Sequence, residues 1–187
     1  MKIKNLFEAS NPWAHIPEDV VSWLKLHLKN FDLKNASHFS FENGELNLNK
    51  DSRAVFGGIS DEDIPEWKFG SVGEIEFDNT NSFTKFDFLP YRCDYNLQFD
   101  FKMSLKGIYK RVTECNIFYI SKETTSGLLD LLRIKNIRGG ILVSGGTSSI
   151  DPDFKKAFLL VKFGFEDGDD ILEVQDRFID AGLERFL

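Results

Sequence analysis

The sequence predicts an α+β fold, in which a meandering antiparallel β-sheet is covered on one face by an N-terminal helix and by C-terminal helices. Helical spacing of apolar residues near the start of the chain is the first observation behind this prediction. The second is a middle third that alternates apolar and polar residues with a period of two, and the third is a return to helical spacing near the end. We expect residues 1–187 to form a single domain, because domains typically hold about 100–200 residues.

The first predicted elements are a helix over residues 17–30 and a β-hairpin over residues 38–49. Pro17 suits the first turn of a helix, where its missing amide hydrogen costs no hydrogen bond. Apolar residues then recur three and four positions apart, at Val20, Trp23, Leu24, Leu28 and Phe31. In the hairpin, Asn43 and Gly44 both tolerate the positive φ angles that a two-residue turn requires.

Strands are predicted over residues 72–78, 82–89, 95–105 and 114–120. The third is the clearest, because one side of it is apolar throughout: Tyr95, Leu97, Phe99, Phe101, Met103 and Leu105. Strict alternation of this length indicates an antiparallel strand with one dry face and one wet face. No internal repeat with a period of about 20–50 residues is evident.

The last third of the chain combines a short predicted helix over residues 124–136, a strand over residues 140–144 and two longer helices. The first of these helices begins after Asp151, which is a favourable N-cap and is followed by a proline at the first helical position. The second begins near residue 170. We expect the amphipathic helices to cover the apolar face of the sheet.

The composition favours a cytoplasmic protein and disfavours two classes of partner. The formal net charge is −7, from 30 acidic and 23 basic residues, and this opposes binding to nucleic acid and to anionic membranes. The start of the chain lacks the apolar core of a secretory signal, and no stretch approaches the roughly 18–20 apolar residues of a membrane span. Cys93 and Cys115 have no CxxC spacing and are expected to be buried free thiols.

No residue pattern predicts a catalytic centre, a metal site or a cofactor. The three histidines, His15, His27 and His38, are not spaced as zinc ligands, and no cysteine lies near them. The chain also lacks the GxSxG pattern that places a nucleophilic serine on a sharp turn.

The glycine-rich stretch at residues 139–149 allows an alternative function, that of a small nucleotide- or phosphate-binding enzyme. It precedes a predicted helix, and backbone amides at a helix N-terminus bind anions. The residues that supply these amides are Gly145, Gly146, Thr147 and Ser148. The stretch has no lysine and no GxxxxGK[ST] pattern, and Asp151 and Asp153 already place negative charge there. A turn followed by a capped helix is therefore the preferred interpretation.

Two acidic clusters are the predicted partner-binding sites. The first contains Asp61, Glu62, Asp63 and Glu66 with Trp67 beside them, and the second contains Asp167 and Asp170. Dense negative charge attracts a basic partner, and tryptophans frequently dominate the energetics of interfaces. A solvated acidic loop is the simpler alternative for each cluster.

These features favour a non-enzymatic acidic binding protein that caps or inhibits a basic protein partner. Immunity proteins and inhibitors of host defence act in this way, and the analogy rests on composition and on the missing catalytic motifs. Besides the phosphate-binding enzyme, a structural subunit of a phage or another assembly is a further alternative.

Overall fold

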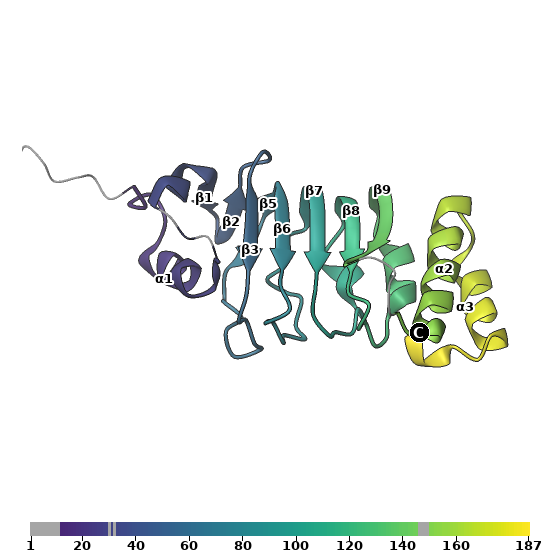
Figure 1. Cartoon of the computed structure of the whole chain (residues 1–187). Coiled ribbons are helices and arrows are strands. Elements are labelled where there is room, and N and C mark those ends of the chain that lie inside the picture. Colours follow the sequence, from purple (N-terminus) through teal and green to yellow (C-terminus); the bar gives the residue numbers. More distant parts are fainter. Residues whose placement is uncertain (1–11, 30, 32, 146–149) are drawn as a thin grey trace, which may run out of the picture.

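The computed structural model describes residues 12–29, 31, 33–145 and 150–187, and Figure 1 shows its architecture. The chain winds into a β-solenoid of about four turns, each of which adds one strand to a parallel sheet. Helices lie at the two ends of this sheet (Figure 1). The prediction of an antiparallel meandering sheet with helices packed on one face is therefore wrong.

The large sheet has a regular register from one turn to the next. Its main strands are β3 (Arg53–Phe56), β6 (Glu74–Phe77), β7 (Arg92–Phe99), β8 (Glu114–Ile120) and β9 (Asn136–Val143), and β5 (Ser71–Val72) pairs with the start of β7. The facing residues are Ala54, Ile75, Leu97, Phe118 and Ile141, at intervals of 21, 22, 21 and 23 residues. The chain thus contains a structural repeat, contrary to the expectation from the sequence.

The alternation of apolar residues identifies the buried face of a strand but does not reveal the direction of its neighbours. In this protein the direction follows from the connections. Residues 100–113 lie between β7 and β8, which is far longer than a tight hairpin loop and sufficient to return the chain to the starting edge of the sheet.

The return segments, and not helices, cover the inner face of the sheet. Phe77 lies at the centre of this core, and its ring stacks on that of Phe99 at a centroid distance of 5.3 Å and contacts Phe83 edge-on at 5.2 Å. Phe83 belongs to the segment 82–89, for which the sequence predicted a strand, but the structure shows an irregular return segment whose phenylalanines are buried.

The predicted strand over residues 95–105 is correct only in part. It ends at Phe99, and the buried residues Phe101, Met103 and Leu105 follow it on the return segment. Tyr95 is 46% exposed, because the register of β7 against β8 shifts between Cys93 and Asn96. The alternation therefore continues beyond the end of the strand.

The N-terminal cap closes one edge of the large sheet. It contains α1 (Glu18–His27), the 3₁₀ segment η1 (Leu33–His38) and a small sheet of β1 (Phe39–Glu42), β2 (Glu45–Leu48) and β4 (Lys68–Phe69). The Lys29 amide donates to the Val55 carbonyl at 2.9 Å, so that the chain after α1 pairs with β3. The predicted helix and the hairpin turn at Asn43 and Gly44, with φ of 53° and 79°, are confirmed.

The C-terminal cap closes the other end. It contains α2 (Pro152–Asp167), α3 (Ile171–Asp180) and η4 (Glu184–Phe186), while η2 (Ile108–Lys110) and η3 (Leu128–Arg133) belong to the return segments. Asp151 and Asp170 accept hydrogen bonds at the starts of α2 and α3, which confirms both predicted helices. The helix predicted over residues 124–136 is the shorter η3, against which α2 packs.

Candidate functional site

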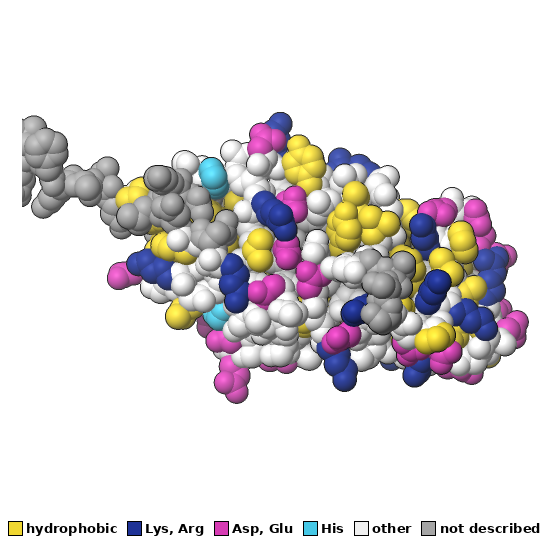
Figure 2. All heavy atoms as spheres, viewed as in Figure 1, with side chains coloured by type: hydrophobic (Ala, Val, Ile, Leu, Met, Phe, Trp, Pro, Cys, Tyr) yellow, Lys and Arg dark blue, Asp and Glu magenta, His cyan; other side chains and the backbone are white. Residues whose placement is uncertain are grey.

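The outer face of the large sheet is the broad surface that lies between the two caps (Figure 1). The register places one outward residue of each strand in a row across the sheet: Val55, Glu76, Gln98, Tyr119 and Leu142. A second row contains the residues that follow β6, β7, β8 and β9: Asp78, Asp100, Ser121 and Ser144. Figure 2 shows acidic side chains over β6 and β7 and hydrophobic ones over β8 and β9. Polarity therefore changes along the solenoid axis.

The second row continues the hydrogen-bonded ladder of the strands. The amide of Asp78 donates to the Phe56 carbonyl at 2.9 Å, and the amide of Asp100 donates to the Phe77 carbonyl at the same distance. The backbones of Asp78 and Asp100 consequently lie one strand apart, or about 4.8 Å along the sheet.

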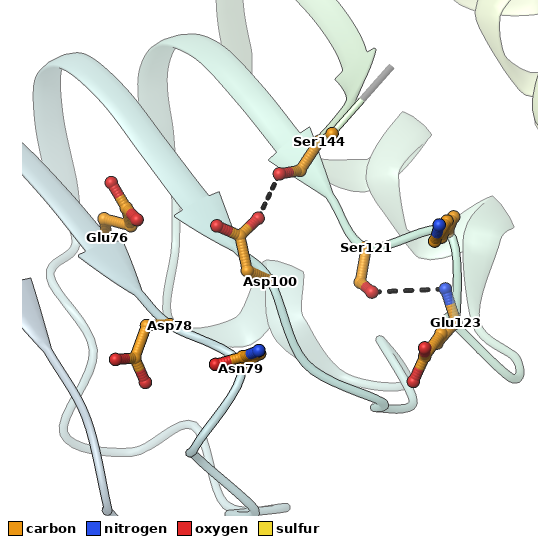
Figure 3. Close-up of a pocket in the computed structure, with 9 residues that line it drawn as sticks. Glu76, Asp78, Asn79, Asp100, Ser121, Glu123 and Ser144 are labelled. Carbon is orange, nitrogen blue, oxygen red and sulfur yellow. Dashed lines mark hydrogen bonds between the residues drawn. The ribbon is translucent and has the colours of Figure 1, made fainter. Parts of the chain in front are cut away.

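A hollow of about 450 Å³ opens beside this row, and we call it the acidic hollow (Figure 3). Its lining residues come from several turns: Glu76, Asp78, Asn79, Asp100, Ser121, Lys122, Glu123, Ser144 and Gly145. Four of the nine are carboxylates and one is a cation, so that the lining is predominantly acidic.

Two of the carboxylates are paired with cations at the N-terminal side of the hollow. Asp78 lies 3.4 Å from the Lys29 ammonium and accepts a hydrogen bond from the Thr80 amide at 2.9 Å. Burial raises the pKa of Asp78, but these partners outweigh it and the pKa lies below its usual value. Glu76 accepts a hydrogen bond from Arg53 and thereby raises the pKa of that guanidinium.

Asp100 and Glu123 differ from Asp78 and Glu76, because neither of them forms an ion pair with a described residue. Asp100 accepts hydrogen bonds from the Gln98 amide nitrogen at 2.8 Å and from the Ser144 hydroxyl, and both donors are neutral. Arg53 acts on Asp100 only at longer range. Glu123 is exposed at the far side of the hollow (Figure 3). These two carboxylates retain charge that a cation from outside can neutralise.

An apolar patch adjoins the acidic hollow on the same face. It consists of Leu142 and the half-buried Ile117 and Tyr119. Hydrophobic side chains gather over β8 and β9 in Figure 2. Leu142 is 36% exposed and pairs in register with Tyr119. Gly140 pairs with Ile117 in the register, and a Cβ at the preceding Gly139 would lie 2.9 Å from Ile117 Cγ1, so that a glycine at this position makes room for the Ile117 side chain.

Two carboxylates of the first predicted cluster accept hydrogen bonds from the protein itself. Asp61 accepts hydrogen bonds from the hydroxyl and the amide of Thr84, both at 2.6 Å, and these lower the pKa of Asp61. Asp63 accepts hydrogen bonds from the hydroxyl and the amide of Ser60, which lower its pKa in the same way. Glu62 and Glu66 are exposed.

Trp67, the predicted anchor of that cluster, is only 8% exposed. Its ring lies edge-on to Trp23 at 5.1 Å and to Phe69 at 5.3 Å. The indole is therefore buried in the N-terminal cap. It does not form an exposed aromatic anchor beside the exposed carboxylates Glu62 and Glu66.

The second predicted cluster lies at the opposite end of the solenoid (Figure 1). Asp170 accepts a hydrogen bond from the Leu172 amide at 2.8 Å and caps α3, and Asp167 is the exposed last residue of α2. The structure thus does not bring the two predicted clusters together.

The glycine-rich stretch is described only in part. Gly145 has a φ of 73° and lines the acidic hollow, whereas Gly146, Thr147 and Ser148 lie outside the described residues. Asp151 caps α2 and pairs with Arg185 at 3.0 Å. An anion near Gly145 would therefore lie beside the carboxylates of the hollow.

Comparison of the chain with models of protein families, with curated proteins and with solved structures found no match. Among the described residues, no group of three or more His, Cys, Asp or Glu side chains is arranged to hold a metal ion. None of the described helices is long and apolar enough to cross a membrane.

Proposed function

We propose that this protein is a non-enzymatic binding protein that caps or inhibits a basic protein partner. The observation that carries the proposal is the outer face of the sheet, where Asp100 and Glu123 lack cation partners among the described residues and lie near an exposed apolar patch. Carboxylates of this kind steer a basic partner toward the surface, and apolar contacts then slow its release. Solenoids commonly bind partners on such extended surfaces.

The alternative of a nucleotide- or phosphate-binding enzyme receives less support. A phosphate bound near Gly145 would approach Asp100 and Glu123, which line the same hollow. Repulsion between like charges in a partly enclosed site opposes such binding. Lys122 is the single cation in the lining and faces four carboxylates.

The exposed residues Glu62, Glu66 and Asp167 remain proposed secondary contacts, because each adds negative charge without an ion pair to a described residue. We also propose a cytoplasmic location. The free thiols Cys93 and Cys115 support it, since reducing compartments keep such thiols unpaired.

The test starts with affinity capture from the native host, followed by binding kinetics of each purified candidate over a range of salt concentrations. We expect a basic partner whose association rate falls steeply with salt while its dissociation rate changes little, because exposed charges are screened over about 8 Å at physiological ionic strength. A specific partner that is itself acidic, or an association rate that does not respond to salt, would contradict the proposal.

A further inference from the structure

The open sheet face also defines the kind of segment that a partner presents, an inference that rests on the proposed function. We infer that an extended segment of the partner crosses the strands along the solenoid axis, with a lysine or arginine in the acidic hollow and an apolar side chain on the patch. The polarity of the face along this axis is the observation behind this inference.

The acidic hollow suits a cationic side chain in both charge and position. Asp100 lies in the middle of the lining, and Glu123 lies opposite Asp78 across the hollow (Figure 3). Because Lys29 and Arg53 already pair with Asp78 and Glu76, an incoming cation meets the two carboxylates that lack an ion pair with described residues. Guanidinium groups are the best match, since their planar donors can contact more than one carboxylate.

The apolar patch suits the second side chain. Leu142 and Tyr119 are side by side in the register, and Ile117 lies two residues before Tyr119 on the same outward face of β8. An apolar side chain from the partner can cover all three. A basic side chain at this end of the face gains less electrostatic attraction, because the outward row contains no carboxylate here.

The strand spacing sets the separation of the two side chains in the partner. Asp100 directly follows β7 and the patch is centred between β8 and β9, so the two lie about one and a half strand spacings apart across the sheet and about two residues apart along the strands, or roughly 10 Å in all. An extended chain rises about 3.3 Å per residue, and a basic and an apolar residue about two to four positions apart therefore reach both sites.

The test uses short Gly/Ser peptides that carry one arginine and one phenylalanine, and the full-length protein labelled for NMR spectroscopy. In one set the two residues are about two to four positions apart, and in the control set the separation is about twice as long. Each set includes peptides in which the arginine precedes the phenylalanine and peptides in which it follows the phenylalanine. We expect the first set to bind more tightly and to shift the amide resonances of Asp100, Tyr119 and Leu142.

Three variants test whether the peptide binds at this surface. Asp100→Asn and Leu142→Ser should each weaken the matched peptide about two- to fivefold, whereas the control Asp176→Asn, which removes the same charge at an exposed position on α3, should leave it unchanged. Thermal unfolding of each variant confirms that it remains folded.

The outcomes distinguish the inference from the function on which it rests. If the matched peptides do not bind, or if their shifts lie on the loop at residues 61–66 and neither Asp100→Asn nor Leu142→Ser weakens them, the inference is wrong. The proposed function then still stands or falls on the salt dependence of the captured partner. Equal affinity for both peptide sets also overturns the inference, because binding would then not depend on the separation between the arginine and the phenylalanine.

Discussion

Replacement of Phe77 by alanine is the most direct test of the solenoid core. The side chain is fully buried and has four aromatic neighbours from three different turns. Above and below it in the sheet, Phe56 and Phe99 stack at centroid distances of 5.9 and 5.3 Å; behind it, Phe83 and Phe88 contact it edge-on at 5.2 and 5.9 Å.

The expected loss is large compared with the stability of a typical domain. Truncation of a buried phenylalanine to alanine costs about 3–5 kcal/mol, and the aromatic contacts place Phe77→Ala at the upper end of that range. Domains typically unfold with about 5–15 kcal/mol. With a urea dependence of about 2 kcal/mol per molar, a loss of 4 kcal/mol lowers the midpoint by about 2 M.

Urea unfolding should be followed with two probes, because they report on different parts of the molecule. Trp13, Trp23 and Trp67 are the three tryptophans of the chain, and all lie in the N-terminal cap or on the segment that leads into β4. Tryptophan fluorescence therefore monitors that end, whereas far-ultraviolet circular dichroism monitors the whole solenoid. In a stack of turns each turn is stabilised by its neighbours, so we expect both midpoints to fall in Phe77→Ala.

The matched control is Tyr95→Ala, which removes an aromatic ring from the exposed part of β7. A surface change of this kind should alter the free energy of unfolding by no more than about 0.5 kcal/mol. A folded Phe77→Ala protein that loses less than about 1 kcal/mol would refute the reasoning, because the ring could not then be the centre of a packed core.

Three further predictions concern acid stability, the thiols and the return segments. Hydrogen bonds lower the pKa of Asp61 in the folded state. The stability that Asp61 contributes is therefore present above its unfolded pKa of about 3.9 and is lost as the pH falls through its folded pKa. Asp61→Asn should flatten the decline in the free energy of unfolding that is measured between about pH 5 and pH 2. Burial raises the pKa of Cys115 to about 12 and raises that of Cys93 as well, so a thiol reagent at pH 8 should modify both only after denaturation, and fast labelling of the native protein would show that this part of the core opens. Gly127→Ala should lower the melting temperature far more than Gly168→Ala. Both glycines have a positive φ, but only at Gly127 would a Cβ lie close to another segment, 2.3 Å from a backbone nitrogen of the neighbouring return segment. Equal melting temperatures of the two variants would contradict this.

Local signals in the sequence predicted the elements that local interactions determine. The helix that begins after Asp151 has its cap and its proline within two residues, and the hairpin has both turn residues adjacent at Asn43 and Gly44. Such features need no knowledge of distant contacts. They therefore appear in the structure where the sequence predicted them.

The direction of the strands depends on contacts between residues more than 20 positions apart, and the local pattern does not contain it. The apolar alternation at Leu97 and Phe99 is the same for parallel and antiparallel neighbours. The inner positions of successive turns also vary in residue type, as Ala54, Ile75 and Phe118 illustrate, and this hides the repeat from a search for identical residues. Only the spacing of about 22 residues between equivalent strands reveals the turns.

Two of the four carboxylates of the acidic hollow come from one repeated position, which explains why a search for dense local charge did not single out Asp100. The residue after each of β6 and β7 is an aspartate, and the residue after each of β8 and β9 is a serine; successive ones lie 21 to 23 residues apart. Residues so far apart form no cluster in the sequence. By contrast, Asp61, Asp63 and Asp170 occur where acids are dense, and their carboxylates accept hydrogen bonds from their own loop or helix end or from a nearby segment. In this solenoid the locally dense carboxylates belong to a loop and a helix end, whereas the chemistry of the outer face depends on residues one turn apart.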